Sequence, residues 1–179
     1  MKRLKILCLC WLSALLFSIA PILLQDTAGV KISEKFLTYQ NSRLGFNISY
    51  PTGWQVIEEN PDRVIFNSFG NATVRIIVDN VTKFGNMSSE GGVSAHNYAI
   101  NGTKNLGGIA SYAHITSVFV GTSHQPGWSV DYFIPPSHIL DTVLVTNGKL
   151  FTINFVITAI KEDKVLATLQ SMMSSFQVT

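Results

Sequence analysis

Cysteine is absent from the chain after residue 10, because its two cysteines, Cys8 and Cys10, both lie in the apolar N-terminal segment. The rest of the chain therefore has no disulfide partner, no thiol nucleophile and no cysteine metal ligand. Cys8 follows only two apolar residues, too few for the lipid-attachment site of a lipoprotein. The folded part must be stabilised by its hydrophobic core.

Charged residues are also scarce, at 13% of the 179 residues, and they form no basic run. Three of the 13 basic residues and one of the 11 acidic residues lie within residues 1–29, which leaves ten of each in the remainder. The net charge of +2 therefore comes from the N-terminus. Without a basic patch, neither nucleic-acid binding nor polybasic attachment to a membrane surface is indicated.

Motifs of common catalytic sites are missing as well. The sequence has no Gly-x-Ser-x-Gly elbow and no glycine-rich phosphate loop. Four histidines are present, none at ligand spacing with another: His96, His114, His124 and His138. A metal site would need His114 and His124, or His138 and Asp141, to converge with a third ligand. We therefore expect no catalytic residues, no metal site and no cofactor.

The N-terminus carries the longest apolar run. Lys2, Arg3 and Lys5 precede the uncharged segment Ile6–Leu24. A signal-peptide core has about 7–15 apolar residues and a spanning helix about 20, so this hydrophobic helix is either a signal peptide or a membrane anchor. We assign it to residues 1–29, with removal favoured over retention. Residues 30–35 are a short tether, and both alternatives place the domain at 36–179 outside the cytoplasm.

Asparagine gives a second indication of export. Five N-glycosylation triplets occur, at Asn47, Asn71, Asn80, Asn86 and Asn101. Asn47 falls in the middle of an expected strand, so the glycosylation candidates are the other four. The alternative is that these asparagines and threonines serve turns and strand faces.

Alternating patterns predict a domain rich in β-strands. In the stretch from Gly45, the residues Phe46, Ile48 and Tyr50 share one strand face, and Pro51 ends the strand because it cannot donate to a sheet. Strands are also expected over 36–39, 54–57, 63–69, 72–81, 113–120, 128–134, 142–146 and 150–158. Hairpins are expected at Gly70-Asn71 and at Asn147-Gly148, the latter a strong signal for a two-residue turn.

Two helices are expected. Ser94 is a candidate N-cap for a helix over 95–105 that ends at Gly107-Gly108. A second helix over 161–176 carries an apolar stripe that would pack on a sheet, formed by Val165, Leu166, Leu169, Met172, Met173 and Phe176. Strands with short connections and helices at the middle and end indicate an α+β domain with a mainly antiparallel sheet.

Three motifs together resemble the PsbP-like family. They are Tyr39 followed by Gly45-Phe46-x-Ile48-x-Tyr50-Pro51-x-Gly53-Trp54, the hairpin Asn147–Ile153, and a closing helix that ends in Ser174-Ser175-Phe176. The resemblance spans about residues 36–178. It implies an antiparallel sheet of about six strands with helices on its two sides, and a non-enzymatic role as an accessory or binding subunit.

The family's namesake is the extrinsic PsbP subunit of the photosystem II oxygen-evolving complex. A Ran-binding nuclear import factor and mycobacterial LpqN-type lipoproteins share the fold. Short exported PsbP-like chains of prokaryotes, including archaea, are particularly close in style to the present chain. It lacks a long basic N-terminal arm and a plastid-transit composition, so the resemblance does not extend to a photosynthetic role.

The most distinctive polar segment is the loop Gly121–Gly127, which leads into Trp128. Loops on a rigid sheet often carry binding residues. The loop and its neighbours supply the candidate ligand- or partner-binding residues: His124, Gln125, Trp128, Asp131, Tyr132 and His138. The alternative is a plain hairpin connection with Trp128 in the core. Asp131 alone would make a weak calcium site.

Two functions remain open from the sequence. The first is an exported, non-enzymatic accessory protein that docks on a protein partner in a membrane-associated complex at the extracytoplasmic face. The second is an envelope protein that holds a small apolar or ionic ligand between sheet and helix, for which an apolar pocket above roughly 300 Å³ would speak. An enzyme would require the histidines to converge with Asp131.

Overall fold

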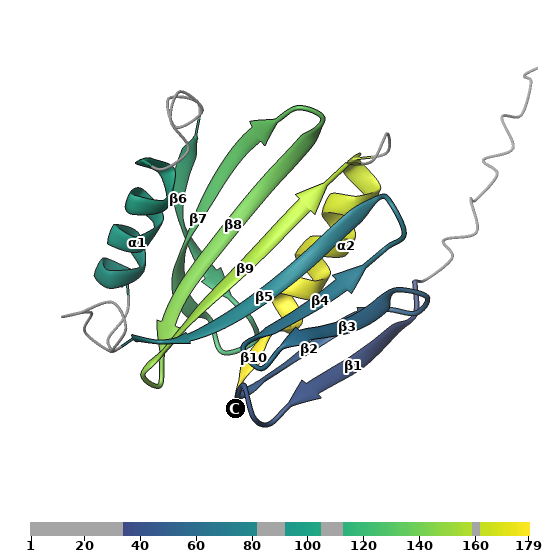
Figure 1. Cartoon of the computed structure of the whole chain (residues 1–179), viewed down its shortest axis with the longest axis horizontal. Helices are drawn as coiled ribbons and strands as arrows, with labels where there is room; N and C mark the ends of the chain where they lie inside the picture. Colours follow the sequence, from purple (N-terminus) through teal and green to yellow (C-terminus); the bar gives the residue numbers. More distant parts are fainter. Residues whose placement is uncertain (1–33, 82–91, 105–112, 159–161) are drawn as a thin grey trace, which may run out of the picture. The chain divides into compact units, whose positions relative to one another are not determined.

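Two antiparallel sheets and two helices make up the part of the chain described by the computed structural model, residues 34–81, 92–104, 113–158 and 162–179 (Figure 1). The predicted signal or anchor helix at 1–29, most of the tether, Asn86 and Gly107-Gly108 lie outside these residues. Within them, no helix is long and apolar enough to cross a membrane.

The larger sheet has seven strands in the order β3-β4-β5-β9-β8-β7-β6. Their bounds are β3 Gln55–Asn60, β4 Arg63–Asn67, β5 Ala72–Asn80, β6 His114–Val120, β7 Gln125–Ile134, β8 Ser137–Thr146 and β9 Lys149–Ile157. The smaller sheet has the order β1-β2-β10, with β1 Phe36–Asn41, β2 Phe46–Pro51 and β10 Gln177–Val178. The helices are α1 Gly92–Lys104 and α2 Glu162–Ser175.

The predicted α+β fold with a mainly antiparallel sheet is confirmed, but the main sheet has seven strands rather than about six, and a second sheet is present. The hinge after β2 explains the second sheet. Pro51 ends β2, and Gly53 adopts a φ of 96°, a left-handed conformation that glycine tolerates. The chain thereby leaves the small sheet and enters the edge of the large one as β3.

The hairpin predicted at Asn147-Gly148 joins β8 to β9. Both residues have positive φ, 51° and 71°, as a two-residue turn of this kind requires. The flanking pairs Val145↔Leu150 and Thr146↔Lys149 are in register. This turn sets the register of the two central strands, and therefore decides which of their side chains share a face.

The two helices cover opposite faces of the large sheet. Phe151 and Ile153 of β9 pack in one core cluster with Met172 of α2, whereas Leu150 packs in another with Ala95 of α1. Because neighbouring residues of a strand point to opposite faces, α1 and α2 lie on different sides. Figure 1 shows α1 over the end of the sheet formed by β6, β7 and β8, and α2 beside β9 and β2.

The apolar stripe predicted for the closing helix is confirmed. Leu169, Met172 and Phe176 are buried, and the other stripe residues pack against the same cluster. The Phe176 ring stacks on Phe46 of β2 at 5.6 Å and meets Phe151 edge-on at 5.7 Å. Phe176 therefore joins the small sheet, the end of α2 and the large sheet.

The middle helix begins earlier than expected. Its first residue is Gly92, so Ser94 lies inside the helix and the prediction that it forms the N-cap is wrong. The buried residues Ala95 and Ala99 lie four positions apart on one helix face. These two residues place this face of α1 against the sheet.

Candidate functional site

The polar loop is shorter in the structure than the predicted Gly121–Gly127. The turn covers Gly121 to His124, and β7 already begins at Gln125, whose partner in β6 is Val120. His124 is exposed with a φ of 50°, and its Nδ1 lies 3.2 Å from the carbonyl oxygen of Thr122. Gln125 is half-buried as the first residue of the strand.

The remaining predicted binding residues are divided between the two faces of the sheet. Trp128 and Tyr132 lie on the α1 face, where Trp128 packs against the buried Val143 and Tyr132 against Ala99. Asp131 falls between them in sequence and points to the α2 face. His138 joins it there, because its Nε2 lies 2.6 Å from Asp131 Oδ1. The six residues therefore do not form one rim.

The pairing of His138 with Asp131 brings together two titratable groups that are 7 positions apart. His114 stands opposite Asp131 in the register of β6 and β7. His138 meets Asp131 rather than Asp141, whose side chain is on the other face. Within the described residues, no group of three or more His, Cys, Asp or Glu side chains is placed to hold a metal ion.

An apolar groove of about 200 Å³, here called the α2 groove, runs between α2 and the sheet. It is lined by Val118, Phe119, Ser129, Leu140, Thr142, Phe155, Leu166, Leu169, Gln170 and Met173. Its polar floor is internally satisfied, since the Thr142 hydroxyl donates to Ser129 Oγ at 3.2 Å. Phe119 at the groove is 72% exposed, and Phe133, further along the same hairpin, is 57% exposed.

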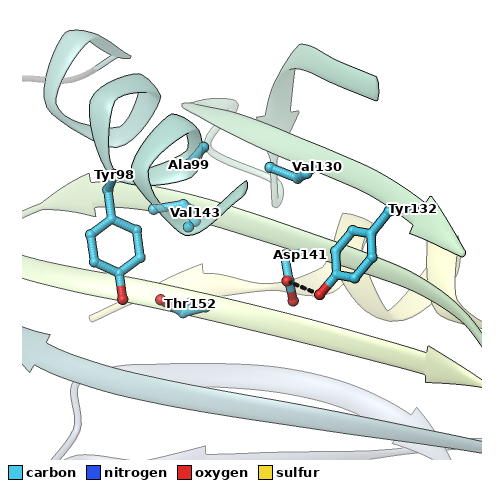
Figure 2. Close-up of a pocket in the computed structure, with 8 residues that line it drawn as sticks. Tyr98, Ala99, Val130, Tyr132, Asp141, Val143 and Thr152 are labelled. Atoms are coloured by element: carbon cyan, nitrogen blue, oxygen red, sulfur yellow. Dashed lines mark hydrogen bonds between the residues drawn. The ribbon is translucent and has the colours of Figure 1, made fainter. Parts of the chain in front are cut away.

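A second cavity, the α1 pocket, has a volume of about 180 Å³ and lies between α1 and the opposite face (Figure 2). Its lining residues are Tyr98, Ala99, Gly102, Val130, Tyr132, Asp141, Val143 and Thr152. The Tyr132 hydroxyl donates to Asp141 Oδ2 at 2.8 Å, and Asn154 Nδ2 donates to Asp141 Oδ1. The pKa of Tyr132 is raised, mainly by burial of its hydroxyl and to a smaller extent by the hydrogen bond to Asp141.

Sequence reasoning did not single out the α1 pocket. It named Tyr132 as a binding residue and Asp141 only as a possible companion of His138. The available signal was that Asp141 is the only charged residue in the largely apolar segment between His138 and Thr146, where a carboxylate needs partners.

Three of the four glycosylation candidates can be placed. Asn71 is exposed in the β4–β5 turn, Asn80 is exposed at the end of β5, and Asn101 is exposed on α1. Asn86 lies outside the described residues. None of the three lines the α2 groove.

These features define a class of α+β protein in which an antiparallel sheet carries one helix on each face. A model of the PsbP family matches residues 34–178. The chain therefore belongs to the PsbP family, in agreement with the resemblance of its motifs. This is in general a family of non-catalytic accessory proteins that act through interactions with protein complexes.

A solved structure shows the same fold. The solution structure of cyanobacterial PsbP (CyanoP) from Synechocystis sp. PCC 6803 matches with a TM-score of 0.57 and 18% identity, over 87% of this chain and 99% of that chain. A crystal structure from Bacteroides thetaiotaomicron VPI-5482 matches with a TM-score of 0.46 and 13% identity, over 79% of this chain and 48% of that one. No curated protein matches the sequence.

Proposed function

We propose that this protein is an exported accessory protein that docks on a protein partner in a membrane-associated complex at the extracytoplasmic face. Family membership supports the accessory role, and the apolar N-terminal segment supports export. The single observation that carries the docking proposal is the α2 groove with the exposed Phe119 at its side. Aromatic side chains are enriched at the energetic centres of protein interfaces.

The size of the groove favours a protein over a small ligand. At about 200 Å³ it is smaller than the roughly 300–1,000 Å³ of ordinary ligand pockets. Phe119, which is opposite Pro126 in the register of β6 and β7, is the groove residue next to the β6–β7 turn. A groove of this size suits a partner segment that inserts a few apolar side chains.

The partner is expected to contribute apolar side chains rather than charge. The groove is lined almost wholly by apolar groups, and its two floor hydroxyls bond to each other. The nearby titratable side chains of Asp131 and His138 already contact each other, with 2.6 Å between Oδ1 and Nε2. Burial of the groove by an apolar segment would therefore leave few polar groups unsatisfied.

Site-specific photo-crosslinking in the native host tests this proposal. A photoreactive phenylalanine analogue replaces Phe119 in one full-length protein and Phe69 in a second. Phe69 is an ideal control because it is also 72% exposed but lies in the β4–β5 turn. We expect position 119, and not position 69, to cross-link to one membrane-associated protein. Equal labelling from both positions, or none from either, would contradict docking through the groove.

Substitution gives a second readout. Phe119→Asp should abolish the cross-link formed from a photoreactive residue at the groove position Gln170, whereas Phe69→Asp should leave it unchanged. Circular dichroism of both variants checks that the fold is intact. A cross-link from position 170 that survives Phe119→Asp in a folded protein would refute the role of the exposed ring.

A further inference from the structure

The α1 pocket has a negatively charged floor between apolar and aromatic walls. Figure 2 shows the Asp141 carboxylate directed toward the Tyr132 hydroxyl, and the Tyr98 side chain reaching from α1 over the sheet. Val130 and Val143 supply the apolar lining. Gly102, with no side chain, leaves space on the helix side. The pocket lies on the sheet face opposite the α2 groove and is independent of the proposed docking function.

The charge of Asp141 has no positive partner among the described side chains. Both of its hydrogen-bond donors, Tyr132 and Asn154, are neutral. These bonds hold the carboxylate in place without balancing its charge. The nearest arginine by register is Arg75 of β5, which pairs with Asn154 of β9, so its backbone is two strands, roughly 10 Å, from that of Asp141. A half-buried carboxylate without a counter-ion favours the binding of a cation.

The walls favour an organic cation over a metal ion. Within the described residues no cluster of metal-ligating side chains exists, and a single carboxylate is a weak site for a hard cation. Two tyrosine rings, Tyr98 and Tyr132, line the pocket, and aromatic faces attract ammonium groups. The Thr152 side chain adds a hydroxyl that can accept a further N–H. The valines provide contact for a short hydrocarbon group.

The volume limits the size of the ligand. An engineered apolar cavity of about 150 Å³ is known to bind benzene, a molecule with about six heavy atoms. A pocket of about 180 Å³ therefore holds a ligand of similar or slightly larger size. Amino acids with long side chains and lipid headgroups with attached chains exceed this volume.

We propose that the α1 pocket binds a small alkylammonium cation, with the ammonium group on Asp141 and the hydrocarbon chain against Val130 and Val143. The ammonium group has three N–H donors and is compact, so it matches a carboxylate at the floor of a narrow cavity. The site is formed by α1, β7, β8 and β9, so it exists only in the folded domain.

Calorimetric titration of the full-length protein with n-butylammonium and with 1-butanol tests the proposal. The two probes have nearly the same size and differ in charge. We expect n-butylammonium to bind at least tenfold more tightly than 1-butanol. Equal affinities, or no binding by the cation, would overturn the proposal, and this comparison requires only the wild-type protein.

Two substitutions locate the site. Asp141→Asn should remove the preference for n-butylammonium, whereas Asp131→Asn, the same change on the opposite face, should leave it intact. Gly102→Leu should weaken binding of the cation at least tenfold, because a Cβ at position 102 meets no atom within 4 Å and the new side chain would extend over the pocket. Leucine also favours a helix over glycine, so this variant should remain folded. Unchanged binding by folded Asp141→Asn or Gly102→Leu protein would contradict the assignment.

Discussion

The contact between Gly121 and the end of α2 gives the sharpest prediction for the fold. Gly121 has a φ of 73°, its N–H donates to the carbonyl oxygen of Met173 at 3.2 Å, and a Cβ at this position would lie 1.8 Å from the carbonyl oxygen of Phe176. Real Cβ contacts essentially never fall below 3.0 Å. We therefore predict that Gly121→Ala separates the β6–β7 turn from the end of α2.

The cost follows from three contributions. A left-handed conformation costs an alanine about 1–2 kcal/mol, partly offset by about 0.4–1 kcal/mol from the less flexible unfolded chain. Loss of the Gly121–Met173 hydrogen bond adds about 0.5–1.5 kcal/mol. Displacement of Phe176, which is 1% exposed, adds part of the roughly 3–5 kcal/mol for complete loss of a buried phenylalanine. We expect a total loss of about 2–5 kcal/mol in the free energy of unfolding.

Gly148 provides a matched control. Its φ of 71° is nearly the same as that of Gly121, but a Cβ at position 148 meets no atom within 4 Å. Gly148→Ala should therefore show only the backbone effect, about 0–1.6 kcal/mol after the unfolded-state offset. Urea unfolding followed by circular dichroism measures both variants. Equal losses of stability in Gly121→Ala and Gly148→Ala would refute the argument that the backbone of Phe176, which follows α2, excludes a side chain at position 121.

Four further outcomes are expected. Phe176→Ala should lower the free energy of unfolding by about 3–5 kcal/mol in urea, because the ring is buried against two other rings. Burial and a hydrogen bond raise the pKa of Tyr132 from 10.0. Its contribution to stability is therefore full below pH 10 and lost as the pH rises further, so Tyr132→Phe should flatten the loss of stability above pH 10. Mass spectrometry of the protein from its native host should find an N-terminus near residue 30; an intact leader would establish the anchored alternative. If the host N-glycosylates exported proteins, Asn71→Gln and Asn101→Gln should each increase electrophoretic mobility, and unchanged mobility would assign these residues to turns and surfaces alone.

Local patterns in the sequence were sufficient for much of the fold. Asn147-Gly148 predicted the β8–β9 hairpin, because both residues accept positive φ. The alternation of Phe151, Ile153 and Phe155 predicted the buried face of β9, and these residues are 0–2% exposed. Such signals depend on residues that are close in sequence, so they require no knowledge of which distant strands pair.

The number of sheets could not be read in the same way. The short strand β10, Gln177–Val178, pairs with Asn47 and Phe46 across almost the whole domain. Two residues carry no periodicity from which a strand could be predicted. The pairing depends on the position that α2 gives to the end of the chain, which is a tertiary effect.

The candidate sites show a similar division. Strand alternation alone places Trp128 and Tyr132 on one face and Asp131 on the other, so the separation of these residues was available from their numbers. The contact of Asp141 with Tyr132 and Asn154 could not be predicted from the residue numbers. It depends on two strand registers, that of β7 with β8 and that of β8 with β9. A shift of one residue in the β7–β8 register would move Asp141 away from Tyr132, and a shift in the β8–β9 register would move it away from Asn154.

Successive side chains of β8 point to opposite faces of the sheet. The two proposed sites can therefore be altered separately by mutation, although both use residues of this strand. Asp141 contributes to the α1 pocket, while its neighbours Leu140 and Thr142 line the α2 groove. The core of the sheet is close-packed and its strands have one register in the described residues. Binding on one face therefore has no second strand arrangement through which it could change binding on the other face. Changes at Phe119 should therefore act on docking without altering cation binding, and changes at Gly102 should do the reverse. The two functions can then fail independently, because Asp141 points to one face of β8 whereas Leu140 and Thr142 point to the other.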